Sequence, residues 1–161
     1  MTAQILIADD ERSSRELLSS ALKSKGYHSV AFESGTKLLE HLDQYQPDLI
    51  LLDVMMPDLD GYQVCQRLRS QQQTKHTPIL IVTAMESLES KMKGFDAGAD
   101  DYLTKPFEVE ELQARVEVWL RRATKPGTSE HGVESKSIAV FSLRGGTGVS
   151  SIAANLSAGL A

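Results

Sequence analysis

Leu49-Ile50-Leu51-Leu52-Asp53 joins four consecutive large apolar residues to a carboxylate, and it is the most apolar stretch of the chain. A continuous run of this kind is typical of a central parallel strand, because such a strand is covered on both faces. Pro57 and Gly61 follow in the next segment, and both residue types are common in loops. We therefore expect a central strand at 49–52 with Asp53 at its carboxyl end.

The rest of the first 122 residues repeats this pattern of strand and helix. Four further stretches are strand-like: 5–8, 30–32, 79–82 and 102–103. Five stretches have helical spacing: 13–25, 37–42, 62–69, 88–97 and 108–122. Strands that alternate with helices predict an α/β fold, here a doubly wound five-stranded parallel sheet with helices on both faces. In such sheets, ligands bind beyond the carboxyl ends of the strands.

Composition excludes several classes of protein. The 161 residues are 41% hydrophobic and 24% charged, which is the balance of a soluble globular protein. The net charge of -5 argues against a protein that binds nucleic acid directly, because such proteins usually carry a basic face. No apolar run approaches the roughly 20 residues that span a bilayer, and the first residues show no signal-peptide pattern. We expect a cytoplasmic protein without membrane insertion.

Polar side chains stand at the carboxyl ends of four predicted strands. Asp9 and Asp10 follow the first strand and Asp53 the third, while Thr83 ends the fourth and Lys105 follows the fifth. Converging carboxylates repel one another, and a bound divalent cation removes that cost. Hard oxygen ligands suit Mg²⁺, with Mn²⁺ as an alternative. Asp53 can then attack a phosphoryl donor while the ammonium and hydroxyl groups neutralise the developing charge.

A simpler interpretation exists for each of these residues taken alone. An acidic residue at a strand end can merely cap the next helix, as Asp10 could do for the helix that starts near Ser13. Capping does not explain why a hydroxyl and an ammonium follow in order at the ends of later strands. The ordered set therefore favours phosphoryl chemistry.

The ordered motifs resemble the receiver domain of response regulators over residues 4–122. They are Asp9-Asp10, Asp53, Met56-Pro57, Asp60-Gly61, Thr83-Ala84, Gly98-Ala99-Asp100-Asp101-Tyr102 and Lys105-Pro106-Phe107. The resemblance implies a flavodoxin-like fold and a two-component phosphorelay, with a sensor histidine kinase or a phosphotransfer protein as the phosphoryl donor. It implies a signalling domain and not an enzyme in its own right.

The resemblance also implies a role for each matching residue. Asp53 is implied as the phosphoacceptor. The implied metal ligands are the carboxylates of Asp9, Asp10 and Asp53 and the backbone carbonyl of Met55. The residues implied to stabilise the phosphoryl group are Thr83, Ala84 and Lys105. Thr83 and Tyr102 match the switch pair of the family, and the peptide bond before Pro106 is implied to be cis.

The region around the fifth predicted strand resembles receivers that form homodimers through the fourth helix, the fifth strand and the fifth helix. The matching residues are Lys91, Asp100, Asp101, Glu111, Arg115 and Arg122. The candidate pairs across such a dimer are Lys91 with Glu111 and Asp101 with Arg115 or Arg122. The alternative is a solvated charged face, in which exposed pairs contribute little.

The sequence changes character after residue 123, where the receiver-like domain (1–123) ends. Residues 124–136 contain Pro126, Gly127 and Gly132 without an apolar period, and we expect a flexible linker. Residues 137–161 then combine a strand-like run, a glycine-rich turn and a helix-like segment. About 25 residues cannot form a core, so we expect a truncated strand-loop-helix tail that begins a further domain of a longer protein.

A glycine-rich turn between a strand and a helix can present backbone N–H groups to phosphate. Residues 137–161 resemble the start of a ParA/MinD-type P-loop ATPase, whose loop would comprise Arg144, Gly145, Gly146, Gly148, Val149 and Ser150. Arg144 and Val149 replace the two lysines of that family, so we expect a degenerate loop and no ATP binding by this segment. A receiver joined to such a module resembles the TadZ/CpaE group of pilus-assembly proteins.

The sequence leaves three other functional hypotheses open. A haloacid-dehalogenase-like phosphatase also uses an Asp nucleophile, but it needs a second Asp at the position of Met55. A pseudo-receiver would keep the fold without phosphorylation and serve as a localisation or dimerisation module of a pilus-assembly protein. The third reading is a filament or polar-scaffold protein in which the tail dominates.

Overall fold

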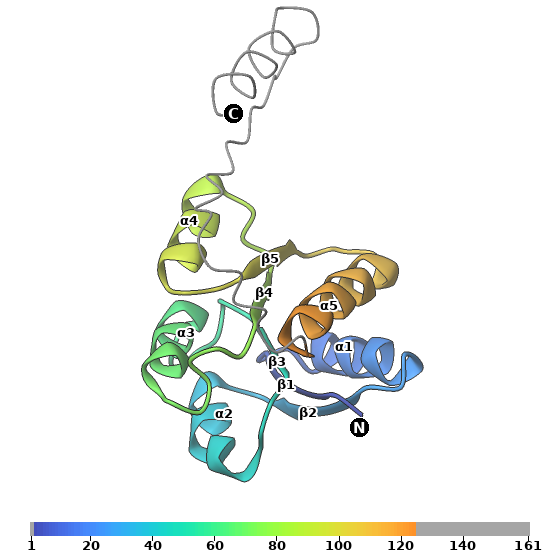
Figure 1. Ribbon diagram of the computed structural model, residues 1–161. Helices are drawn as coiled ribbons and strands as arrows, with labels where there is room; N and C mark the ends of the chain where they lie inside the picture. The colour runs from blue at the N-terminus through green and yellow to red at the C-terminus, as the bar shows by residue number, and fades with distance from the viewer. Residues whose placement is uncertain (1, 125–161) are drawn as a thin grey trace, which may run out of the picture. The chain divides into compact units, whose positions relative to one another are not determined.

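Five parallel strands form the sheet of the computed structural model, which describes residues 2–124 (Figure 1). The strands are β1 (Gln4–Ala8), β2 (His28–Phe32), β3 (Leu49–Leu52), β4 (Ile79–Thr83) and β5 (Asp101–Thr104). Their order across the sheet is β2-β1-β3-β4-β5, with β3 in the centre, and all neighbouring pairs are parallel. The predicted α/β fold is confirmed.

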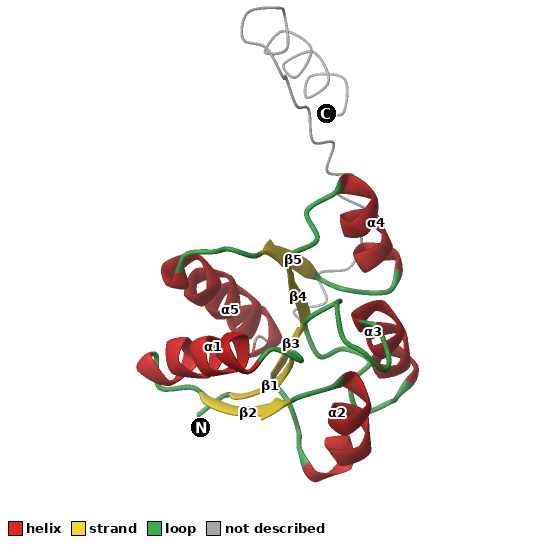
Figure 2. Ribbon diagram, turned by 180° about the vertical axis from the view of Figure 1, so that it is seen from behind, coloured by secondary structure: helices red, strands yellow, loops and turns green. Residues whose placement is uncertain are grey.

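Helices connect the strands and cover both faces of the sheet. They are α1 (Arg12–Ser24), α2 (Gly35–His41), the 3₁₀ turn η1 (Leu42–Gln44), α3 (Gly61–Ser70), α4 (Leu88–Asp96) and α5 (Val109–Thr124). Helices α1 and α5 lie on one face, and α2, α3 and α4 lie on the other (Figure 2). Within residues 2–124, no helix has the length and apolar character needed to cross a membrane.

The sheet separates two apolar clusters, because successive side chains of a strand point to opposite faces. Ile5 and Ile7 of β1 join the cluster beneath α1 and α5, whereas Leu6 joins the cluster on the α2 and α3 side. Strands β3 and β4 are buried along their whole length. This double coverage is what the continuous apolar run of β3 predicts.

The start of α3 lies against the end of β3, and Gly61 makes this approach possible. The side chain of Asp60 caps α3 by accepting a hydrogen bond from the backbone N–H of Gln63 at 2.8 Å. A Cβ atom on Gly61 would lie 2.2 Å from the backbone oxygen of Asp53, a distance that no packing tolerates. Glycine at position 61 therefore lets α3 pack against the backbone of Asp53, the residue that follows β3.

The last helix differs slightly from its predicted bounds. Helix α5 reaches Thr124, whereas the sequence assigns residue 124 to the linker. Residues 109–125 contain no glycine or proline that would stop the helix earlier, and Pro126 disfavours helical geometry at the residue before it. The predicted linker beyond residue 124 and the P-loop-like segment at 137–161 lie outside the described residues.

Candidate functional site

The carboxyl ends of β1 and β3 bring the predicted carboxylates together. Ala8 and Leu52 are partners in the β1–β3 register, so the residues that follow them, Asp9 and Asp53, stand side by side. One carboxylate oxygen from each of Asp9, Asp10 and Asp53 lies within 4.8 Å of the others. Asp9 and Asp53 are buried and Asp10 is exposed. The site thus has two fixed carboxylates and a third that faces solvent.

Lys105 lies between the two buried carboxylates. Its Nζ donates to Oδ2 of Asp9 at 2.6 Å and to Oδ2 of Asp53 at 2.8 Å. Burial lowers the pKa of this ammonium group, but the hydrogen bonds to Asp53 and Asp9 outweigh burial and raise its pKa above the ordinary lysine value. Lys105 is therefore a fixed positive charge at the carboxyl edge of the sheet at neutral pH.

Two residues of α1 that sequence reasoning missed hold Asp9 in place. The buried hydroxyl of Ser14 donates to Oδ2 of Asp9 at 2.6 Å. Arg15 donates from Nη1 to the backbone carbonyls of Asp9 and Asp10 at 2.7 and 2.9 Å. Their position in the sequence could have indicated this role, because both residues lie in the first turns of the helix that follows Asp9 and Asp10.

Asp53 is oriented by its own loop. The backbone N–H of Met55 donates to Oδ1 of Asp53 at 3.1 Å, and the backbone N–H of Asp53 donates to the carbonyl of Ala8 at 2.8 Å. Oδ1 therefore faces the loop while Oδ2 faces Lys105. The side chain of Met55 is 60% exposed, so it lies at the solvent edge of the site.

Thr83 and Ala84 lie at the same edge of the sheet but are not joined to the carboxylates by a hydrogen bond in the described contacts. Thr83 is fully buried at the end of β4, and its carbonyl accepts from the backbone N–H of Lys105 at 2.8 Å. Its hydroxyl accepts from the backbone N–H of Met85 at 3.5 Å. Ala84 is exposed. The peptide bond between Lys105 and Pro106 is cis.

Tyr102 of β5 points into the protein. It is 7% exposed, and its hydroxyl donates to the carbonyl of Met85 at 2.6 Å. The ammonium of Lys91 lies 5.8 Å from the centre of its ring. Burial, followed by the neighbouring phenol of Tyr62, raises the pKa of Tyr102. The phenol therefore stays protonated and remains a donor.

The charged residues proposed for a dimer have partners within their own chain. Arg115 donates from Nη1 to both carboxylate oxygens of Asp101 at 2.9 and 3.0 Å, and it also contacts Glu111. Asp101 with Arg115 is also one of the candidate pairs across a dimer. It forms inside the chain because α5 runs beside β5, and Trp119 donates to the same carboxylate at 3.1 Å. Arg122 stacks over Trp119, 4.7 Å from the centre of its ring system.

Asp100 is likewise a structural residue of this chain. Its Oδ2 accepts from Arg69 at 2.6 Å and from the backbone N–H of Ile79 at 2.8 Å. Arg69 also donates to the carbonyls of Gly98 at 2.8 Å and Thr77 at 2.7 Å. Arg69 thus ties the loop before β5 to the loop before β4, a role that nothing in the sequence indicated.

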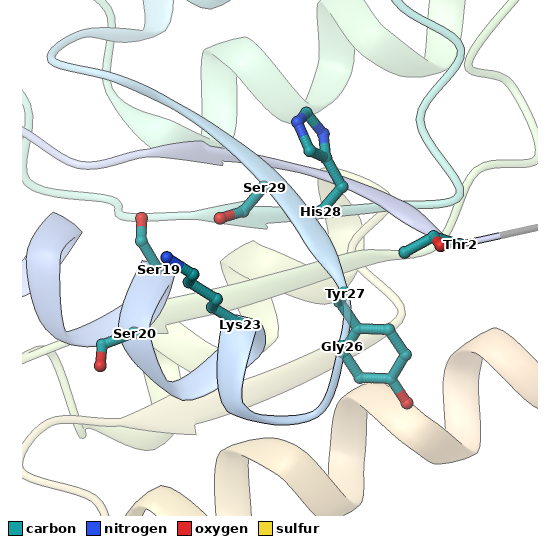
Figure 3. Close-up of a pocket in the computed structure, with 8 residues that line it drawn as sticks. All are labelled: Thr2, Ser19, Ser20, Lys23, Gly26, Tyr27, His28 and Ser29. Carbon is teal, nitrogen blue, oxygen red and sulfur yellow. The ribbon is translucent and has the colours of Figure 1, made fainter.

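Several hollows lie on the α1 side of the domain. A groove of about 240 Å³ adjoins the site, and its lining includes Leu17, Lys105 and Phe107. A wider hollow of about 700 Å³ between α1 and β2 is lined by hydroxyl groups, Lys23 and His28 (Figure 3). The wider hollow contains none of the carboxylates of the site, so we assign it no part in the chemistry.

Comparison with known proteins identifies the family. Residues 5–117 match the family described as response regulator receiver domain. The chain belongs to this family. Response regulator receivers are signalling domains of two-component phosphorelays. The chain is 46% identical over 129 residues to the DNA-binding dual master transcriptional regulator RpaA of Synechocystis, covering 80% of this chain and 54% of that protein.

Two further relatives agree with this assignment. The receiver is 47% identical over 126 residues to response regulator MprA of Mycobacterium bovis, covering 78% of this chain and 54% of MprA. It also matches the solved receiver domain of sensor histidine kinase PA1611 of Pseudomonas aeruginosa, with a TM-score of 0.70 and 29% identity over 75% of this chain and 99% of that one. The PA1611 structure has a magnesium ion coordinated in its active site cleft. The chain spans about half the length of the curated relatives it matches.

Proposed function

We propose that this receiver accepts a phosphoryl group on Asp53 from a sensor histidine kinase or a phosphotransfer protein. The observation that carries the proposal is the position of Lys105, whose ammonium bridges Asp53 and Asp9 at 2.8 and 2.6 Å. An ammonium held at the nucleophilic carboxylate is well placed to pair with an oxygen of an incoming phosphoryl group. The carboxylate of Asp53 would form the new O–P bond as the donor's bond to phosphorus breaks.

The three carboxylates also fit a divalent cation. One oxygen from each lies within 4.8 Å of the others, and a set of hard oxygen donors is the set that Mg²⁺ prefers. Among residues 2–124, the ammonium of Lys105 bridges two of the three carboxylates. Asp9, Asp10 and Asp53, with the carbonyl of Met55, would hold the ion. When bound, the ion would neutralise charge on the phosphoryl oxygens. Ser14 and Arg15 would keep Asp9 in position for it.

The groove beside Lys105 supports a kinase or phosphotransfer protein as the donor. Leu17 is 46% exposed on α1, and Phe107 lines the same groove from the loop before α5. Phe107 is half-buried, so Leu17 supplies the exposed apolar surface of this groove, and a larger exposed apolar patch beside a reactive group would mark a docking surface. A partner that covers Leu17 and Phe107 would deliver its phosphoryl group directly above Asp53 and Lys105.

A homodimer through α4, β5 and α5 remains our proposal for self-association. The described surface of α4 displays Leu88, Met92 and Phe95, which are 75%, 57% and 50% exposed. The candidate pairs between subunits are Lys91 with Glu111 and Asp101 with Arg115 or Arg122. Of these, Asp101 and Arg115 also pair within the chain. Sedimentation should show a monomer–dimer shift when beryllofluoride, a phosphoryl mimic, is added. A monomer under both conditions would dispose of the dimer.

The remainder of the chain carries a separate proposal, which rests on sequence alone. We propose that residues 137–161 begin a degenerate P-loop ATPase-like module, as in TadZ/CpaE pilus-assembly proteins, joined to the receiver by the linker at 124–136. RpaA is described as DNA-binding. For this chain we propose no direct binding of nucleic acid, because its net charge is -5 and DNA-binding surfaces are usually basic.

The decisive experiment is a phosphorylation assay that uses the chain as it stands. Incubation with acetyl phosphate and Mg²⁺ should add about 80 Da, the mass of one phosphoryl group. Asp53→Asn and added EDTA should each abolish the gain, and Asp43→Asn, an exposed control outside the site, should keep it. Absence of any gain in the wild type would reject the phosphoacceptor and favour a pseudo-receiver that acts as a localisation module.

A further inference from the structure

Helix α4 has an unusual distribution of side chains for a helix on a sheet. Its buried residues are the small Ser90 and Gly94, whereas its large apolar residues Leu88, Met92 and Phe95 are exposed. The stabilisation from apolar burial scales with the area removed from water, and a serine and a glycine remove very little. Other interactions must therefore hold α4 in place.

Two tyrosine hydroxyls supply such interactions, one from β5 and one from α3. The hydroxyl of Tyr102, in β5, donates to the carbonyl of Met85 in the loop before α4 at 2.6 Å. The hydroxyl of Tyr62, the second residue of α3, donates to the carbonyl of Ser90 in the first turn of α4 at 2.9 Å. The amino-terminal end of α4 is thus tied both to the sheet and to α3.

The space beneath α4 is occupied by the ring of Tyr102. A Cβ atom on Gly94 would lie 3.4 Å from two atoms of this ring and 3.0 Å from Cδ1 of Ile81. The missing side chain at Gly94 therefore makes room for the ring. Tyr62 packs on the same apolar cluster as Tyr102, and it forms no hydrogen bond with the carboxylates or Lys105 among the described contacts.

We propose that Tyr62 is a positioning residue whose hydroxyl latches α4 to α3 and thereby keeps α4 seated over the ring of Tyr102. The proposal goes beyond phosphoryl transfer, because it assigns the position of α4 to a residue outside the Asp53 pocket. Loss of the latch should loosen α4 selectively and leave the carboxylates, Lys105 and the apolar contacts of α5 unchanged.

Amide hydrogen exchange of the unphosphorylated chain tests the latch. In Tyr62→Phe, which keeps the ring and removes only the hydroxyl, the amides of α4 should exchange about threefold to tenfold faster, the effect of one lost hydrogen bond. The amides of α5 should not change. Tyr45→Phe is the matched control, because Tyr45 packs on the same cluster. Equal acceleration of α4 and α5, or no acceleration of α4, would overturn the proposal.

A second readout separates positioning from a general loss of stability. NMR signals of the Tyr102 ring, observed with labelled tyrosine, should shift or broaden in Tyr62→Phe and stay in place in Tyr45→Phe. Unchanged Tyr102 signals in Tyr62→Phe would overturn the latch. Neither readout involves phosphorylation, so a chain that fails to react with acetyl phosphate would reject the phosphoacceptor and leave the latch standing.

Discussion

Helices α4 and α5 flank the same edge of the sheet from its two faces, yet they are held by different forces (Figure 1). Helix α5 buries Leu112 and Val116 completely and leaves Leu120 only 7% exposed. Helix α4 buries only a serine and a glycine. One helix is therefore fixed by apolar packing and the other by hydrogen bonds from Tyr62 and Tyr102.

The difference has an energetic meaning. Full burial of a leucine or valine side chain contributes about 1.5–3 kcal/mol, whereas one hydrogen bond contributes a net of about 0.5–1.5 kcal/mol. A helix with three buried apolar side chains stays in place when one neighbour moves, whereas α4 can open at lower cost. The loop from Thr83 to Met85 leads from the end of β4 into α4, so we expect a change at Asp53 to reach the weakly held helix first.

Truncation of a buried side chain on α5 should give the largest effect. Leu112→Ala removes a fully buried leucine, and the free energy of unfolding should fall by about 2–5 kcal/mol. Phe95→Ala removes a larger but half-exposed side chain on α4 and should change it by less than about 0.5 kcal/mol. Urea unfolding measures both variants. Similar losses in the free energy of unfolding for the two variants would contradict the proposed difference between the helices.

Loss of the ammonium at the site should have an intermediate effect. Lys105→Met leaves Asp9 and Asp53 without their shared partner, and the free energy of unfolding at neutral pH should fall by about 1–3 kcal/mol. Part of the loss should return when Mg²⁺ is added to the variant. Lys91 lies over the Tyr102 ring and provides the control. In Lys91→Met, Mg²⁺ should not change the free energy of unfolding.

The contribution of Lys105 to the free energy of unfolding depends on pH in a definite direction. The pKa of Lys105 is raised in the folded protein, so its contribution is fully present below the ordinary lysine value of 10.5. The contribution is lost as the pH rises through the folded pKa. The stabilities of wild type and Lys105→Met should therefore differ by a constant amount near neutrality and converge only in strong alkali. Convergence between pH 6 and 8 would contradict the assignment.

Substitution of Gly94, which lies on the buried face of α4, should change stability less. Gly94→Ala gains up to about 1 kcal/mol of helix propensity but places a methyl group against Ile81 and the Tyr102 ring. The two effects should nearly cancel, so the net change stays below about 1 kcal/mol while the Tyr102 ring signals shift. The reverse substitution Ala114→Gly, at an exposed position of α5, should cost the full propensity difference of about 1 kcal/mol and leave Tyr102 unaffected.

Sequence reasoning reaches some of these features and not others, for physical reasons. The central strand and the pocket are accessible because apolar runs mark buried strands, and parallel strands bring their carboxyl ends to one edge. The hydroxyl of Tyr62 and the guanidinium of Arg69 are not accessible. Each bonds to a backbone carbonyl of a distant segment, and any residue can provide a carbonyl. Sequence also does not decide whether Arg115 pairs with Asp101 within the chain or across a dimer, because Arg115 fits both pairs equally well.

Cys65 lies on α3, and its reactivity reports whether loosening of α4 stays local. Cys65 is fully buried, and burial raises the pKa of its thiol from 9.0 to about 11. Alkylation by iodoacetamide at pH 8 should be slow in the native chain, because the thiolate is the reactive form. Tyr62→Phe should leave this rate unchanged even as α4 exchanges faster.

The same thiol gives a pH effect whose sign is fixed. Between pH 9 and about 11, the unfolded chain releases the thiol proton and the folded chain keeps it, so the free energy of unfolding falls as the pH rises. Cys65→Ala should remove this part of the slope, which is measured as the difference between two pH series and so cancels the titration of other groups. If Tyr62→Phe also accelerates alkylation at pH 8, then α3 opens together with α4. The boundary between the packed and the hydrogen-bonded regions would in that case lie inside α3 and not between the two helices.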